Sequence, residues 1–405
     1  MLFCLIMSKP SVLIAGAGIA GPVCAYWLSR AGIRSTIIER APELRNTGQQ
    51  IDVRGSGLTV VKRMGLEEVV RSKTTKEKGL AFVNSRGKRL AVFPVDEKGG
   101  MSFTSDIEIL RENLVKIFYD ASKEDTEYIF GDHVAEIHQE NGKKVRVVFE
   151  KGGEKEYDFV IGADGMNSKT RQLAFPSEKP LKSLGQYTSF FTIPYKETDG
   201  EFACWYNAPG GRCILLRPDS AGCTRAYLSI MSSKPAGYEK LDIPAQKKMM
   251  REMFEDAGWE ALRVLKGMDA AEDFYMQEIA QVKMDHWSQG RVALIGDAGY
   301  CPSPISGMGT SLAIVGAYVL AGEIAKCGDD YKAGLEGYEE RMRPYVTKAQ
   351  SLPPGAPAIA NPQSKWGIAV LNNIVRFISW SGLATLFGKM SSPPAEDKSL
   401  PLYEF

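Results

Sequence analysis

Three short segments of the 405-residue chain combine glycines with residues that could hold a charged ligand. They are GAGIAG at 16–21, GADG at 162–165 and GDAG at 296–299. Glycine lets the backbone turn sharply and lets a ligand approach it closely, and the free N–H groups at the start of a helix bind anions. The chemistry that these residues could support is therefore the binding of a ligand that carries phosphate groups.

The first of these segments lies where a dinucleotide-binding turn is expected. An apolar strand pattern leads into it, a helical pattern follows as far as Arg30, and a second strand pattern ends in Glu39. In such a βαβ unit Gly16 permits the tight turn, Gly18 lets a pyrophosphate approach the backbone, and Gly21 lets the helix pack close to the strand. Glu39 follows at the distance at which a carboxylate accepts a hydrogen bond from a ribose hydroxyl. The unit therefore predicts a bound dinucleotide.

The three segments, in this order and with Arg111 in the segment ILRENL, resemble the FAD-dependent aromatic hydroxylase family typified by para-hydroxybenzoate hydroxylase. The resemblance covers about residues 9–345. It implies a bound FAD, with its pyrophosphate on the glycine turn, and NAD(P)H as co-substrate. The cofactor-binding residues that it implies, with the neighbours of each motif, are Gly16, Gly18, Ile19, Ala20, Gly21, Glu39, Arg40, Gln50, Asp52, Arg111, Asp164, Asp297, Pro304, Gly307, Met308, Gly309 and Thr310.

Several of these motifs have a specific role in the resemblance. Asp297 resembles the family aspartate that accepts a hydrogen bond from the ribityl chain, and Asp164 matches a DG motif that contacts both FAD and NAD(P)H. Pro304 resembles the proline on the side where oxygen reacts. The glycine-rich segment 306–310 opens a helix whose N–H groups would stabilise negative charge on the reduced ring. Tyr300 stands where the family often has a histidine, which alters the pocket.

The segment TGQQIDVRGSG at 47–57 is similar to the loop before the flavin ring, especially in the tetracycline-inactivating monooxygenases. Gln50 and Asp52 are the residues expected to approach the ring. The match requires a shift of one residue, so both remain open as the contact. The proline-rich linker and the terminal helix instead resemble extensions found in fungal members of secondary metabolism.

These segments must be held by an α/β fold. We predict a Rossmann-like FAD-binding domain of the GR2 type, with an inserted antiparallel-sheet substrate domain and a C-terminal helical extension. Strand patterns between 186 and 232, broken by APGG and RPD, indicate the antiparallel sheet. The predicted boundaries are 9–180 and 280–345 for the FAD-binding domain, 181–279 for the substrate domain, 346–405 for the linker and terminal helix, with part of 75–105 as a candidate addition to the substrate sheet.

Hydrophobic periodicity predicts the remaining elements. Helices are expected at 106–119, 244–266, 311–326 and 366–389, and short strands at 133–137, 145–149, 157–161 and 292–295. The last helix has apolar residues at helical spacing, so we interpret it as packed on the protein and expect no membrane contact.

The inserted sheet is expected to carry the substrate surface. A Tyr or Arg there could stabilise a phenolate, so Arg212, Arg217 and Tyr227 are candidate catalytic residues. Alternation along a strand sends half of any such set away from the ligand. The full set of candidates is Phe190, Phe191, Trp205, Tyr206, Arg212, Arg217 and Tyr227.

Composition restricts the class of protein. Hydrophobic residues make up 44% of the chain and charged residues 24%, which is typical of a globular protein. With 50 Lys plus Arg against 49 Asp plus Glu, the net charge of +1 gives no electrostatic reason to expect a nucleic-acid partner. The seven cysteines and three histidines show no zinc spacing, so no metal is expected. The start MLFCLIM lacks a basic region, and we expect a cytoplasmic protein that is a monomer or a weak homodimer.

The resemblance implies a single-component FAD-dependent NAD(P)H monooxygenase. NAD(P)H would reduce the flavin, and molecular oxygen would then add to give a flavin hydroperoxide. One oxygen atom would pass to an aromatic or polycyclic small molecule. We expect this substrate to belong to secondary metabolism. A tetracycline-type inactivating hydroxylase is the alternative within this class. A flavin-linked prenyl reductase is the alternative from another class, and it would reduce a double bond without consuming oxygen.

Overall fold

A six-stranded sheet carries the predicted dinucleotide turn at the end of one of its inner strands. The computed structural model describes residues 10–45, 48–95, 107–140, 142–219, 222–233, 235–328, 330–382, 397 and 399–405. All neighbouring strands of this sheet pair in parallel except the first two. In order across the sheet they are β17 (Ser288–Gln289), β18 (Val292–Leu294), β11 (Phe159–Gly162), β1 (Ser11–Ala15), β2 (Arg34–Glu39) and β7 (Thr126–Phe130).

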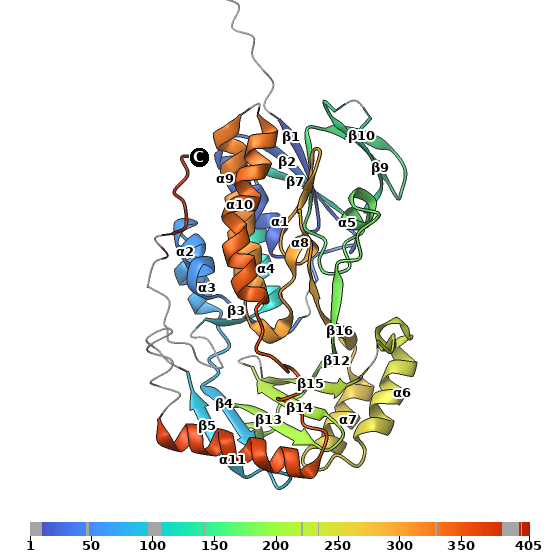
Figure 1. Cartoon of the computed structure of the whole chain (residues 1–405), viewed down its shortest axis with the longest axis vertical. Coiled ribbons are helices and arrows are strands. Elements are labelled where there is room, and N and C mark those ends of the chain that lie inside the picture. The colour runs from blue at the N-terminus through green and yellow to red at the C-terminus, as the bar shows by residue number, and fades with distance from the viewer. Residues whose placement is uncertain are drawn as a thin grey trace, which may run out of the picture.

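Four long helices pack against one another beside this sheet (Figure 1). They are α1 (Ala20–Arg30), α4 (Arg111–Ser122), α9 (Gly309–Cys327) and α10 (Tyr331–Gln350). In the described part of the chain, α9 is the one helix long and apolar enough to cross a membrane by length and composition, but 78% of its apolar stretch is buried inside the protein. A helix that is apolar on all sides and enclosed in this way fits a core helix.

A seven-stranded sheet forms the second large layer. In order its strands are β16 (Tyr275–Val282), β12 (Leu181–Pro194), β15 (Cys223–Met231), β14 (Arg212–Pro218), β13 (Ala203–Ala208), β4 (Gly79–Val83) and β5 (Arg89–Pro94). Neighbours are antiparallel except β13 and β4. One face packs on α6 (Ile243–Phe254) and α7 (Ala261–Ala270), and α11 (Lys365–Ser381) crosses β5 and β13 (Figure 1).

Smaller elements complete the described structure. A two-stranded sheet joins β3 (Gln50–Asp52) to β6 (Glu108–Leu110), and a three-stranded sheet contains β8 (Val134–His138), β9 (Val145–Phe149) and β10 (Glu154–Tyr157). The short helices are α2 (Gly55–Arg63), α3 (Glu67–Ser72), α5 (Lys169–Ala174) and α8 (Asp297–Tyr300), with 3-10 turns at Glu197–Asp199, Tyr238–Lys240 and Pro304–Ser306.

The predicted α/β class with an antiparallel sheet is confirmed, but several element boundaries are wrong. The helix expected at 106–119 begins only at Arg111, because residues 108–110 pair with β3 as a strand. The strand expected at 157–161 is interrupted at Asp158 and contributes to two different sheets. The helix expected at 244–266 is two helices, separated near Gly258, which has a φ of +83°.

Three further differences concern the ends of the chain and the second sheet. The sequence did not predict α10. The helix expected at 366–389 ends at Ser381, where Gly382 adopts the left-handed conformation that stops a helix, and residues 383–389 lie outside the described residues. Strands β4 and β5 join the seven-stranded sheet. The domain boundaries themselves stay a prediction.

The C-terminal residues return to the first layer. The ring of Phe405 lies 4.6 Å from that of Trp27 in α1, and the Tyr403 hydroxyl donates to Glu323 Oε1 at 2.6 Å in α9. The last residues of the chain therefore pack on α1 and α9, in the first layer, and not beside α11.

Candidate functional site

A cavity of about 2630 Å³ is lined by residues from both large sheets. Its wall includes the turn after β1, the segment 48–56, the GADG segment, residues 301–310 and part of the linker after α10. Gly21 lies behind the turn and does not reach the cavity. The predicted cofactor-binding residues on the wall are Gly16, Gly18, Ile19, Ala20, Glu39, Arg40, Gln50, Asp52, Arg111, Asp164, Asp297, Pro304, Gly307, Met308, Gly309 and Thr310.

The glycine turn is shaped by close backbone packing. Gly16 has a φ of +112°, and a Cβ there would lie 2.6 Å from the carbonyl oxygen of Ala163. A Cβ at Gly21 would overlap the carbonyl oxygen of Gly16, so α1 can begin this close to the strand only with glycine. At Gly18 a Cβ would meet only Nη2 of Arg111, at 3.3 Å. Gly16 and Gly21 thus shape the turn, whereas Gly18 keeps its open side clear.

Glu39 closes the turn from the end of β2. Its Oε2 accepts a hydrogen bond from the Ala17 N–H at 2.9 Å, and its Oε1 accepts one from the Ala41 N–H at 2.9 Å. Each carboxylate oxygen retains a further lone pair, so the side chain can still accept a hydrogen bond from a ribose hydroxyl. The neighbouring Arg40 is exposed and also lines the cavity.

Arg111 gives the strongest indication that an anion binds at the glycine turn. It is the first residue of α4, and its guanidinium faces Gly18. Burial lowers its pKa, and no ion pair joins it to any carboxylate among the residues described. A half-buried cation without an ion pair favours an anionic ligand, and a phosphate at the glycine turn would supply that charge. The residues of this wall therefore fit the pyrophosphate of FAD.

Asp164 is held by its own segment. Its carboxylate accepts hydrogen bonds from Ser168 Oγ, from the Thr170 N–H at 2.9 Å and from Thr170 Oγ1 at 3.0 Å. These bonds fix the start of α5, and the neighbouring Ala163 carbonyl packs against Gly16. The geometry gives Asp164 a positioning role, and any direct contact of its carboxylate with FAD or NAD(P)H stays a prediction.

The segment before α2 is joined to the start of α9. Arg54 N donates to Ser311 Oγ at 2.9 Å, and Ser311 Oγ donates to the Arg54 carbonyl at 3.0 Å. Asp52 Oδ2 accepts from Arg54 at 3.0 Å and lies 3.5 Å from where a Cβ on Gly307 would be. Asp52 therefore faces the glycine-rich segment that opens α9. Thr47 lies outside the described residues.

Gln50 points elsewhere. Its N–H donates to the Tyr227 hydroxyl at 3.2 Å, and its Nε2 donates to the Pro218 carbonyl at 3.4 Å. Its Oε1 is buried and accepts no hydrogen bond from the described residues. The two alternatives left open by the sequence are thus separated in space, with Asp52 at the glycine-rich segment and Gln50 at the seven-stranded sheet.

Asp297 and the start of α9 form the third part of the cofactor wall. Asp297 follows β18 and is exposed to the cavity, and desolvation by the surrounding protein raises its pKa. Its Oδ1 lies 3.7 Å from where a Cβ on Gly309 would be. No side chain caps the helix start at Met308, so N–H groups of the first turn are free to meet a ligand. Pro304, in the preceding 3-10 turn, also lines this part.

The opposite wall follows the alternation of the strands. Phe190, Trp205, Arg217 and Tyr227 face the cavity. Phe191 and Tyr206 pack into the core with α6 and α7 on the other face. Arg212 also lies outside the cavity wall, because its guanidinium binds Pro209 O at 2.7 Å, Met253 O and Asp256. The structure thus contradicts the assignment of Arg212, Phe191 and Tyr206 to the substrate side.

The two remaining catalytic candidates differ in their electrostatics. Arg217 donates to both oxygens of Glu77 at 3.0 Å and also to Glu108. Burial alone would lower the pKa of Arg217, but Glu77 above all, with Tyr227 and Asp52, raises it above its ordinary value. Arg217 is therefore a permanent but compensated charge. Burial raises the pKa of Tyr227, which stays neutral and keeps its O–H as a donor while it accepts from Gln50.

Tyr275 and Gln49 are polar residues of the cavity wall that were not singled out from the sequence. Tyr275 stacks on Phe190, with ring centroids 5.0 Å apart, and its hydroxyl donates to Gln49 Oε1. The two residues join the sheet wall to the segment before β3. Tyr275 sits at a cavity-facing position because β16 pairs with β12 in a register that places it opposite Phe190, which the sequence alone does not fix.

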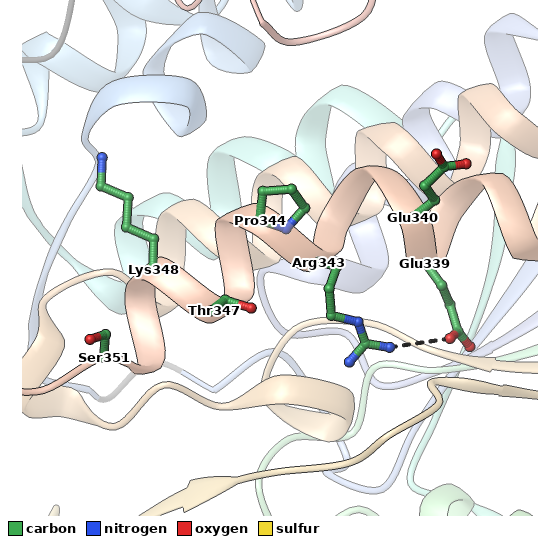
Figure 2. Close-up of a pocket in the computed structure, with 7 residues that line it drawn as sticks. All are labelled: Glu339, Glu340, Arg343, Pro344, Thr347, Lys348 and Ser351. Carbon is green, nitrogen blue, oxygen red and sulfur yellow. Dashed lines mark hydrogen bonds and ion pairs between the residues drawn. The ribbon is translucent and has the colours of Figure 1, made fainter.

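A smaller hollow of about 990 Å³ runs along α10 (Figure 2). Arg343 and Glu339 are bonded to each other there at 3.3 Å, and Glu339 also accepts from Trp287 N and Ser288 Oγ at 2.7 Å each. The Arg343 guanidinium lies 3.9 Å from the centroid of the Trp287 ring. Since its central charges are already paired within the protein, the larger cavity is the candidate functional site.

Comparison with known proteins agrees with this geometry. Residues 9–351 match the family model described as an FAD binding domain. The chain is 39% identical to the FAD-dependent monooxygenase asL6 of Sarocladium schorii over 97% of each chain, and 36% identical to the flavin-dependent monooxygenase eupH of Phoma sp over 96% of each. Among solved structures, tetracycline destructase Tet(51) superimposes with a TM-score of 0.78 at 32% identity, covering 95% of this chain and 99% of that one.

The fold and the cavity define an FAD-binding oxidoreductase. The chain belongs to the FAD binding domain family, within the group A flavoprotein monooxygenases that the sequence motifs resemble.

Proposed function

We propose that the protein is a single-component monooxygenase that uses NAD(P)H and molecular oxygen to oxygenate an aromatic or polycyclic small molecule. This proposal rests on one observation. The same cavity is lined on one side by residues that fit an anionic cofactor and on the other side by aromatic rings. The similarity to fungal monooxygenases over nearly the whole chain supports a substrate from secondary metabolism. A cytoplasmic location is part of the same proposal.

The chain's own residues have distinct tasks in this proposal. Bound FAD supplies the activation of oxygen, which protein side chains lack. Arg111 and the glycine turn hold the pyrophosphate, Asp297 accepts a hydroxyl of the ribityl chain, and the N–H groups at the start of α9 stabilise negative charge on the ring.

The substrate wall orients the second reactant. The rings of Phe190 and Tyr275 are nearly parallel, at 14°, and offer a flat surface on which an aromatic substrate can stack. The Tyr227 hydroxyl can donate to a phenolic or carbonyl oxygen of the substrate. The linker after α10 lines this part of the cavity, and its apolar residues would limit the access of water.

The test uses the protein as purified. We expect flavin bands in the visible spectrum, and oxidation of NAD(P)H with oxygen uptake that rises when aromatic substrates are added. Flavin bands with NAD(P)H oxidation that reduces an added polyprenyl substrate without oxygen uptake would point to the prenyl reductase instead. A protein that cannot take up FAD would contradict the proposal.

A tetracycline-type hydroxylase is the second candidate, favoured by the superposition on Tet(51) and by the segment 48–57. The same assay separates the two candidates when tetracycline is compared with simple phenols and fungal polyketides. Oxygen uptake stimulated by tetracycline above all others would favour the second candidate.

A further inference from the structure

Helix α11 has two apolar faces, and only one of them is packed. Val375 is buried against the edge of the seven-stranded sheet, and Leu371 and Ile378 pack beside it on the same cluster. Ser379 Oγ donates to the Val92 carbonyl at 2.9 Å, and Val92 N donates back to Ser379 Oγ at 3.2 Å. These contacts fix how the helix lies on β5, and so which residues it turns outward.

The outward face carries large apolar side chains. Trp366 is 77% exposed, Ile374 51%, Phe377 56% and Trp380 82%, and Val370 is also exposed. At about 100° per residue these five positions fall within an arc of roughly 120° on the helix. They form one continuous stripe, defined here as the α11 stripe, along a helix that is already anchored by its other side.

The charged residues within α11 itself have one sign. The segment 365–382 contains no Asp or Glu, whereas Lys365 and Arg376 are both exposed and follow one border of the stripe. Strand β5, which lies under α11, begins at a turn that carries the exposed residues Arg86 and Lys88. A surface of Trp, Phe and Ile bordered by cations is complementary to anionic lipid headgroups above an apolar layer.

We propose that α11 docks flat on an anionic bilayer surface, with the α11 stripe at the boundary between headgroups and acyl chains. Trp366 and Trp380 stand at opposite ends of the stripe, and tryptophan is the side chain that best suits a membrane interface, because its ring is apolar and its N–H is polar. From the sequence we expected no membrane contact, because the spacing of apolar residues does not show which of them the protein covers.

This docking has a direct relation to the cavity. Leu80, Trp205 and Leu215 belong to the cluster under α11 and also line the cavity. A bilayer under α11 would therefore lie one helix away from the substrate wall. An apolar substrate dissolved in the bilayer would then be concentrated beside the cavity.

The test is sedimentation of the purified full chain with vesicles of phosphatidylcholine alone and of phosphatidylcholine with 30% phosphatidylserine. We expect binding to the anionic vesicles to exceed binding to the neutral ones, and to fall by about tenfold or more in the double variant Phe377→Ser, Trp380→Ser. The pair Lys365→Glu, Arg376→Glu should also weaken binding, as should 1 M salt, because both remove the electrostatic attraction.

A matched control comes from α7. Leu262 is a large apolar residue that is 70% exposed away from α11, and Leu262→Ser should leave vesicle binding unchanged. Equal binding by the stripe variants and the wild type, or no binding to either vesicle, would overturn the proposal. So would a homodimer in light scattering that the stripe variants convert to monomer, because the α11 stripe would then be an interface between copies.

The outcome is independent of the catalytic proposal. Vesicle binding is measured as the amount of protein in the pellet. This amount does not depend on whether the protein oxygenates any substrate, so the two proposals can fail separately. The visible spectrum of each variant shows that its flavin site is intact, so loss of binding cannot be attributed to unfolding.

Discussion

The two walls of the cavity differ in whether their arginine side chains form ion pairs with the protein's own carboxylates. On the cofactor wall Arg111 is half-buried and forms no ion pair within the described residues, and Asp297 projects into the cavity. On the sheet wall Arg217 is paired with Glu77 and Glu108. At the glycine turn Arg111 thus lacks an ion pair, whereas Arg217 on the sheet wall has two.

The difference indicates what each wall is built to receive. A wall with an unpaired cation gains most from a ligand that brings fixed negative charge, as a pyrophosphate does. A wall whose charges are already satisfied offers aromatic surface and a few neutral donors, and so selects a ligand of low charge. Four substitutions test this contrast.

The largest effect is expected from Gly18→Val. The new side chain would occupy the space between the turn and Arg111 Nη2, which lies 3.3 Å from the Cβ position. Loss of at least two charge-assisted hydrogen bonds, at about 1.5–3 kcal/mol each, should weaken FAD binding more than roughly 100-fold. Quenching of flavin fluorescence measures the Kd. If the variant still purified with a full complement of yellow flavin, the pyrophosphate could not bind at this turn.

Arg217→Met should lower the free energy of unfolding by about 3–5 kcal/mol, because it leaves Glu77 and Glu108 buried without their cation. Urea denaturation of the apo protein measures this loss. The additional changes Glu77→Gln and Glu108→Gln should restore part of it. If Arg217→Met alone cost less than about 1 kcal/mol, the sheet wall would not be electrostatically closed.

Arg111→Met should give the opposite result for stability. FAD affinity should fall by about 1.5–3 kcal/mol, or roughly 10-fold to 100-fold, because a charged partner of the phosphate is lost. The apo protein should be about as stable as the wild type, since Arg111 is partly desolvated and has no ion pair to lose within the described residues. Loss of apo stability similar to that of Arg217→Met would show that the two walls do not differ in this respect.

The smallest effect is expected from Tyr227→Phe. Loss of one neutral hydrogen bond to the substrate should lower kcat/KM by about threefold to tenfold, which corresponds to about 0.5–1.5 kcal/mol, with no change in FAD affinity. Substrate-stimulated NAD(P)H oxidation measures it. Tyr206→Phe is the matched control, because the Tyr206 hydroxyl donates to Ala257 O on the opposite face of the sheet. Equal effects of both changes would exclude Tyr227 as a substrate contact.

The cofactor wall was more predictable from sequence than the sheet wall for a physical reason. A glycine turn is local, so the spacing of Gly16, Gly18 and Gly21 in one segment already fixes how strand, turn and helix meet. The sheet wall depends on strand register, which decides whether Phe190 or Phe191 faces inward. The partners of Arg217 come from residues more than 100 positions away, which no local pattern reveals.

The strand order of the six-stranded sheet has a consequence for synthesis on the ribosome. β1, β2 and β7 all lie in the first 130 residues, but β1 also needs β11, at residues 159–162, and that strand in turn needs β18 at 292–294. At typical elongation rates, an apolar strand edge stays open on the nascent chain for on the order of ten seconds or more. Such an edge is prone to pair with other chains, so we expect the yield of native protein to improve when a chaperone or a lower growth temperature protects it.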